Sequence, residues 1–280
     1  MEEHNPAPLP TIALEVYGDI SVEEALAIRQ EVMACYEVLR ARPLPAAVNL
    51  GLFDTLDQWR AYAKRCREEA GVVTAGEEGF LATHDAWEGV PRLSVCLERL
   101  RGHPRLLQQG ALRQVVAHSI LHGRPDYYRF QVPKALLEAT AALGWDSQVL
   151  LQLLYFVSIA VKGREAAALL VEHGFVPDQI ALAFYQLEKR PDDEELWQMA
   201  RWEPRARVLY LAAQLRPLLY LHPLLAVAPA LQSAGRIMLA HLPTEEVERV
   251  EGLVAALAEN CTGDTHRDVS MGLIMVLNRL

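Results

Sequence analysis

Residues 112–123 (LRQVVAHSILHG) constrain the fold more than any other stretch of the chain. Apolar side chains recur there with helical spacing, and a Gly-Arg-Pro turn follows. The stretch carries His118 and His122, and residues four apart lie on the same face of a helix. The sequence therefore predicts a helix over residues 106–122 that presents both imidazoles on one side.

The residues before this helix alternate between strand and helix patterns. Ser21 predicts a helix start, because Glu24 follows three residues later, and an inward face is expected at Ala25, Ile28, Val32, Cys35, Tyr36 and Leu39. Asp54 or Thr55 is expected to cap the next helix. The predicted strands are residues 11–17, 46–53, 80–84 and 92–97. Helices are predicted at residues 22–42 and from residue 56, and a loop is predicted at residues 71–79.

From Pro133 onward the pattern is helical throughout. Lys162 and Gly163 are expected to interrupt a strongly apolar helix, and proline or glycine breaks separate those that follow. The predicted helices are residues 134–143, 147–161, 164–173, 176–188, 193–201, 204–221, 224–239, 245–259 and 269–280.

Composition narrows the class of protein. Of 280 residues, 51% are hydrophobic and 22% are charged, which is an ordinary globular balance, and the net charge of −9 argues against a nucleic-acid surface. The four cysteines stand far apart, which argues against a zinc ribbon or a disulfide framework.

Two segments of the sequence bear on where in the cell the protein is expected. The N-terminus is acidic and proline-rich, unlike a secretory signal. Residues 217–235 contain no charged side chain, but their three prolines favour buried core helices over a membrane span. We therefore expect a cytoplasmic protein that does not enter a membrane.

The predicted helix at residues 106–122 resembles the active-site helix of zincin metallopeptidases, whose signature is HExxH. If His118 is the second histidine, Gln114 and Val115 replace the first ligand and the glutamate. If His118 is the first, the frame reads His118-Ser119-Ile120-Leu121-His122, and only the glutamate is lost. We prefer this second frame because it needs one departure instead of two.

The order of the elements also resembles the N-terminal half of a zincin. The resemblance implies an α+β fold, in which a zincin-like (gluzincin-like) domain at residues 1–130, a small mixed sheet packed on helices, precedes an all-helical region at residues 131–280.

The resemblance further implies a zinc ion held by His118, His122 and a carboxylate from a later helix, for which Glu165 is the best candidate by position. Glu138 and Asp126 are weaker candidates. Ser119 stands where the catalytic glutamate is expected, and loss of a general base lowers the rate by roughly 10²- to 10⁴-fold.

The residues expected to line the corresponding cleft are Ser119, Asp126, Tyr127 and Tyr128. Paired tyrosines at a helix end are, however, more often packing residues. Thr83, His84 and Asp85 would lie on the strand side facing such a cleft, but a lone histidine near a turn is usually a surface residue.

Three interpretations of the histidines stay open. In the first, both histidines are structural: His118 hydrogen-bonds a carboxylate, and His122 forms a hydrogen bond near the helix C-terminus. In the second, they hold a metal ion without catalysing hydrolysis. In the third, they belong to a working metalloenzyme that uses a different general base. We expect a catalytically degenerate zincin-like protein with a binding or scaffolding role toward a protein or peptide, with homo-oligomers an open option. The alternative is a zinc-dependent hydrolase, such as a peptidase, that uses His118, His122 and Glu165.

Overall fold

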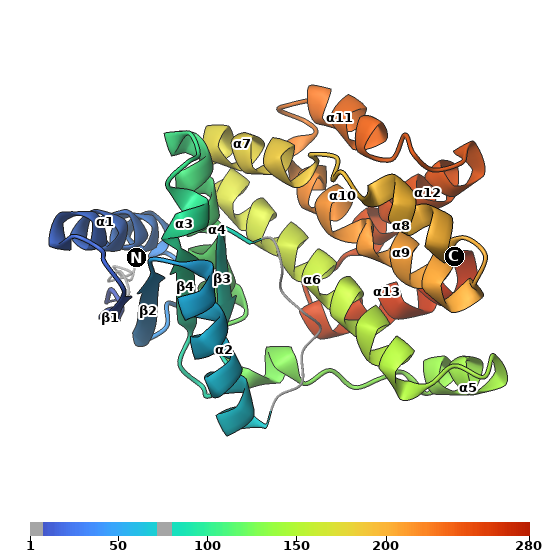
Figure 1. Ribbon diagram of the computed structural model, residues 1–280, viewed down its shortest axis with the longest axis horizontal. Coiled ribbons are helices and arrows are strands. Elements are labelled where there is room, and N and C mark those ends of the chain that lie inside the picture. Colours follow the sequence, from blue (N-terminus) through green and yellow to red (C-terminus); the bar gives the residue numbers. More distant parts are fainter. Residues whose placement is uncertain (1–7, 72–79) are drawn as a thin grey trace, which may run out of the picture. The chain divides into compact units, whose positions relative to one another are not determined.

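The computed structural model describes residues 8–71 and 80–280, so residues 72–79 of the predicted loop lie outside the described part of the chain. The chain divides into two compact units (Figure 1). Unit 1 comprises Met1–Arg129 and Leu169–Leu182, and unit 2 comprises Phe130–Ala168 and Ala183–Leu280.

Unit 1 contains a small mixed sheet, as the sequence predicts. Its strands are β1 (Thr11–Tyr17), β2 (Ala47–Phe53), β3 (Ala82–Asp85) and β4 (Arg92–Cys96). Their order is β1-β2-β4-β3; β1, β2 and β4 run parallel, and β3 pairs antiparallel with β4. Parallel strands need helical crossovers, which the intervening helices supply. The strand β3 therefore forms one edge of the sheet.

The helices of unit 1 cover both faces of this sheet. They are α1 (Val22–Leu39), α2 (Leu56–Ala70), α3 (Leu97–Leu100) and α4 (Arg105–Leu121), followed by the 3-10 helix η1 (Pro125–Tyr128). Ser21 caps α1 by accepting the Glu24 N–H, and the buried face of α1 is the predicted one. Trp59 of α2 packs with Phe53 and Cys96 on one face of the sheet. On the opposite face, α1 and α4 pack against each other.

The segment Leu169–Leu182 completes unit 1 through a buried polar network. Arg113 of α4 lies between two carboxylates, with Glu31 of α1 at 2.5 Å and Asp178 at 3.2 Å. Burial raises the pKa of Asp178, whose side chain is only 2% exposed. Removing one member of such a network leaves a buried charge uncompensated. The network therefore fixes α4 between α1 and this segment.

Gly110 allows the close approach of α4 to the same segment. A Cβ atom at position 110 would lie 2.5 Å from the backbone oxygen of Asp178. The Gly110 carbonyl also accepts a hydrogen bond from the Gln179 side chain. Only glycine fits here without a shift of the backbone.

In the described residues of unit 2 all regular structure is helical, as predicted for the chain after Pro133. Its core includes Leu153, Val157, Leu219, Leu257 and Leu273. Two of the helices after η1, α6 and α7, each contribute one end to unit 1. The helices after η1 are α5 (Lys134–Ala142), α6 (Ser147–Glu172), α7 (Val176–Gln186), α8 (Asp193–Ala200), α9 (Pro204–Ala213), α10 (Leu215–Leu221), η2 (His222–Leu224), α11 (Ala230–Met238), α12 (Thr244–Asn260) and α13 (Thr265–Arg279).

Several predicted helix boundaries are wrong, and three of them have a clear physical reason. The helix α6 runs through Lys162 and Gly163 without interruption, because packing of its buried faces outweighs the weak helix propensity of one glycine. The predicted helix 204–221 breaks at Gln214, since Pro217 has no N–H to donate to the carbonyl of residue 213. The predicted helix 224–239 begins only at Ala230, after Pro229.

No helix within residues 8–71 and 80–280 is long and apolar enough to cross a membrane. The proline-rich segment 217–235 instead contributes to α10, η2 and α11, and several of its leucines are buried.

Gly110→Ala should destabilise the protein by about 1–3 kcal/mol, because the new methyl group meets backbone atoms that cannot rotate away. Gly252→Ala is the matched control: it also lies inside a helix, but its Cβ would meet nothing within 4 Å. We expect that control to be neutral or slightly stabilising. Urea unfolding of the three proteins measures both effects, and equal midpoints for the two variants would contradict the close approach.

Candidate functional site

The C-terminal turn of α4 places His118 and His122 next to each other. The helix ends at Leu121, and the backbone N–H of His122 donates to the His118 carbonyl at 2.7 Å. The two Nδ1 atoms are 3.2 Å apart, and the His122 side chain is fully buried. For this contact to be a hydrogen bond, one Nδ1 must carry a proton and the other must present its lone pair.

A third histidine, His84 of β3, joins this pair. Its ring stacks on His118 with centroids 4.9 Å apart and planes within 10°. The Tyr128 hydroxyl lies 2.7 Å from Nε2 of His84, and the Tyr127 ring lies edge-on to His122 at 5.3 Å. Tyr127 and Tyr128 are therefore beside the histidines. We call the set His84, His118, His122, Tyr127 and Tyr128 the histidine–tyrosine cluster.

Two other residues predicted to line the cleft lie elsewhere. Asp126 is exposed and forms an ion pair with Arg124 at 2.8 Å. Ser119 is 1% exposed and lies in the interior, where its Oγ is 2.5 Å from the Tyr36 hydroxyl of α1. The serine donates its own proton to the Val116 carbonyl, so Tyr36 donates to Ser119. Burial raises the pKa of Tyr36 and keeps the phenol protonated.

Glu165 belongs to α6 in unit 2, where Thr265 of α13 donates to its carboxylate at 2.9 Å. Burial, assisted by nearby Asp268, raises the pKa of Glu165 to about 7 despite the hydrogen bond from Thr265. The weaker candidate, Glu138, is exposed and pairs with Lys134. Both carboxylates thus have local partners within their own unit.

A zinc site can be tested against this geometry. Two nitrogens bound to one tetrahedral zinc lie roughly 3.3 Å apart, so the spacing of the two Nδ1 atoms is suitable. A protein site needs at least a third ligand, however. Across the part of the chain that the structure describes, no group of three or more His, Cys, Asp or Glu side chains could hold a metal ion. The described residues therefore do not fit the zinc site that the resemblance implies.

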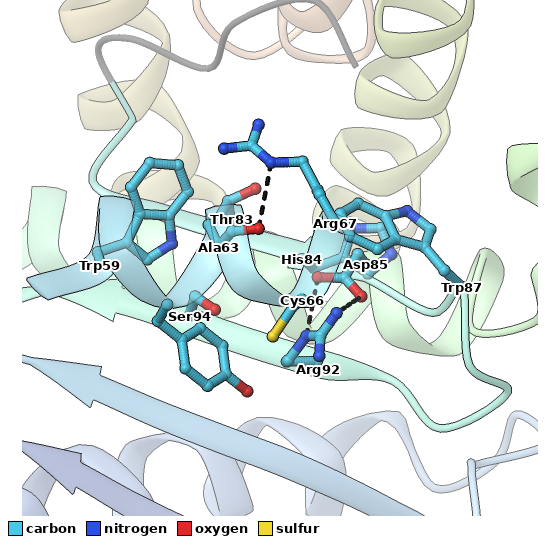
Figure 2. Close-up of a pocket in the computed structure, with 11 residues that line it drawn as sticks. Trp59, Ala63, Cys66, Arg67, Thr83, His84, Asp85, Trp87, Arg92 and Ser94 are labelled. Carbon is cyan, nitrogen blue, oxygen red and sulfur yellow. Dashed lines mark hydrogen bonds and ion pairs between the residues drawn. The ribbon is translucent and has the colours of Figure 1, made fainter. Parts of the chain in front are cut away.

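A small pocket lies on the other face of the sheet, between α2 and the strands β3 and β4 (Figure 2). Its walls include Trp59 and Tyr62 of α2 and Trp87 of the β3–β4 turn. At its base, Arg92 forms two hydrogen bonds to Asp85, at 2.9 and 3.0 Å. Burial raises the pKa of Asp85, and Arg92 opposes that shift.

The same Arg92 guanidinium also lies over the rings of Tyr62 and Trp87, at 5.7 and 5.5 Å. The buried charges of the pocket thus neutralise each other, and the aromatic rings remain as its contact surface. The sequence analysis places only the strand residues Thr83, His84 and Asp85 near a cleft. It gives no signal for the aromatic walls, which the packing of α2 and the β3–β4 turn on the sheet brings together.

Ser119→Glu should destabilise the protein by about 3 kcal/mol or more, because it buries a carboxylate against Tyr36 where no cation is described. Ser119→Ala is the matched control: it adds no charge and should cost less, about 1–3 kcal/mol, because the buried Tyr36 hydroxyl loses its partner. Urea unfolding at neutral pH measures both. A Ser119→Glu protein as stable as wild type would show that position 119 opens to solvent.

Glu165 should make stability depend on pH. Its pKa in the folded protein, about 7, exceeds the value of 4.5 for an unperturbed glutamate, so its favourable contribution is complete below pH 4.5 and is lost as the pH rises through 7. Glu165→Gln cannot ionise. Relative to wild type, this variant should therefore gain on the order of 2 kcal/mol between pH 5 and pH 8. Urea unfolding at both pH values measures the change, and a constant difference would contradict it.

A scan against protein-family models found no match, and searches of curated proteins and of solved structures found no significant match. The comparisons therefore assign no family, and the site rests on its own geometry.

Proposed function

We propose that unit 1 is a catalytically degenerate zincin-like domain that binds an extended segment of a partner protein or peptide without cleaving it. Three features support the zincin-like part: the order of strands and helices, the His118–His122 spacing on α4, and the antiparallel edge strand beside that helix.

The main support for a domain without catalytic activity is the identity and location of Ser119. In the preferred HExxH frame this residue replaces the general base, and a serine cannot take up a proton near neutral pH. Its hydroxyl is also committed to Tyr36 and to the Val116 carbonyl inside the protein. Neither its chemistry nor its location suits the activation of water.

The strand β3 supports the binding role. Among the described residues, β3 pairs with β4 on one side only. An extended peptide adds to such an edge through backbone hydrogen bonds, and its alternate side chains then point to opposite faces of the sheet. On one face they would approach the aromatic pocket of Trp59 and Trp87, and on the other His118 and Tyr128. These two chemically different faces would give the binding its sequence preference.

The alternative is a zinc-dependent hydrolase. Only the 3.2 Å spacing of the two Nδ1 atoms favours it. It would require a third ligand and a base, and Glu165 has a partner in Thr265 instead. A direct activity measurement separates the two functions.

The test combines cleavage and binding on one library of fluorescent peptides. We expect wild type to cleave none of them, with added zinc or with a chelator, and to bind a subset. Trp87→Ala should weaken that binding about tenfold, because an aromatic wall of the pocket is lost.

Trp202→Ala is the control, since Trp202 is 77% exposed in unit 2, and it should leave affinity unchanged. Cleavage that the chelator abolishes would favour the hydrolase instead. Equal binding by both tryptophan variants would remove the pocket from the proposal.

A further inference from the structure

The helix α8 of unit 2 exposes large apolar side chains. Met199 is 63% exposed, and Trp202, just beyond the helix, is 77% exposed. Arg201 keeps right-handed helical dihedral angles, so the helical spacing continues to Trp202. Glu195, Met199 and Trp202, at positions i, i+4 and i+7, therefore form one row along the outer side of the helix. An exposed tryptophan beside an exposed methionine is typical of a surface that contacts another protein.

The inner side of α8 is held by packing and by a hydrogen bond, so the outer side is ordered in advance. Trp197 is 3% exposed, and its ring packs on Tyr210 of α9 at a centroid distance of 5.5 Å. The Tyr210 hydroxyl donates to the Asp193 carbonyl at 2.9 Å, which fixes the first turn of α8. A surface that is already ordered loses little conformational freedom on binding, so its contacts contribute more fully to affinity.

A second row beside the first separates opposite charges along the helix. Glu194, Gln198 and Arg201 have the same i, i+4, i+7 spacing, and all three are exposed. Two carboxylates, those of Glu194 and Glu195, thus lie at the start of the helix, and one guanidinium lies at its end. No salt bridge in the described part of the chain neutralises these three charges. We call the two rows together the α8 face.

The order of the charges on the α8 face distinguishes between possible partners. A basic helix would be attracted by the two carboxylates but repelled by Arg201, and an acidic helix would meet the reverse. Only a partner with both charges, in the opposite order, satisfies both ends of the face. A second copy of α8 that runs antiparallel to the first has this order, because a twofold axis brings the same residues together at both ends.

We propose that the α8 face is the interface of a homodimer, in which two copies of the chain pair antiparallel about a twofold axis. Each end of the interface joins Arg201 of one copy to Glu194 and Glu195 of the other. Met199 and Trp202 fill the apolar centre. One short helix buries little surface, so we expect weak association, with a Kd on the order of tens of micromolar. The inference concerns unit 2 alone and does not depend on the function proposed for unit 1.

Sedimentation velocity of the full chain measures this association, at concentrations from about 1 to about 300 µM, which bracket the expected Kd. Wild type should change from monomer to dimer over this range. Trp202→Ala should raise the Kd about tenfold or more, because it removes the exposed indole from the centre of the interface. Leu151→Ala is the matched control, since Leu151 is 56% exposed on α6, and it should leave the Kd unchanged.

A charge exchange tests the antiparallel arrangement. Glu194→Arg/Glu195→Arg leaves only basic charges on the α8 face, and Arg201→Glu leaves only acidic ones, so each variant alone should stay monomeric. An equimolar mixture of the two should form heterodimers with a Kd close to that of wild type, because opposite charges then meet at both ends. This recovery would also show that both variants are folded.

Three results would contradict the proposal. A wild type that stays monomeric over the whole range would overturn the homodimer and leave the α8 face to a different partner. A dimer that Trp202→Ala and Leu151→Ala weaken equally would place the interface elsewhere on the chain. Charge variants that dimerise alone as wild type does, or a mixture that stays monomeric, would overturn the antiparallel pairing.

Discussion

One buried contact that helps to orient α4 is the hydrogen bond between Tyr36 of α1 and Ser119. Successive residues on a helix are rotated by about 100°, so the inward direction of Ser119 sets the direction of every neighbour. His118 then meets His84 of β3, and His122 turns into the interior. A buried hydroxyl left without its partner costs about 1–3 kcal/mol, so this rotation is strongly preferred. In the HExxH frame of the proposed zincin-like domain, this contact lies at the position of the glutamate.

Periodicity in the sequence predicts most of the helices and strands. The inward face of α1 and the limits of β1 follow from apolar spacing alone. Errors arise where a local signal competes with packing or with the backbone, as at Gly163, which α6 accommodates, and at Pro217, which splits a predicted helix. Local propensity is a weak prior once a helix has buried faces.

The sequence predicts only those contacts of the site that join residues close together in the chain. Helical spacing brings His118 and His122 together, and the adjacent Tyr127 and Tyr128 follow directly. In contrast, the place of His84 depends on the pairing of β3 with β4, and the interior position of Ser119 depends on a tyrosine 83 residues away. The resemblance alone points to Glu165, and the hydrogen bond of its carboxylate to Thr265 spans 100 residues of sequence. The buried ionisable groups fall into two kinds. Arg92 and Arg113 form ion pairs with carboxylates. In contrast, burial lowers the pKa of Lys162 and raises the pKa of Glu165, and both shifts favour the neutral form of the group.

The central claim is that the His118–His122 pair of α4 is a structural hydrogen bond and not half of a metal site. Long-range ¹H–¹⁵N NMR spectra of the histidine side chains, recorded before and after addition of equimolar zinc, test it most directly. His118→Ala and His122→Ala assign the signals. We predict that one Nδ1 of the pair is protonated, that the other accepts its hydrogen bond, and that zinc changes neither signal. If both Nδ1 signals instead moved together to the shifts of metal-bound nitrogen, the pair would be a metal site and the structural interpretation would be wrong.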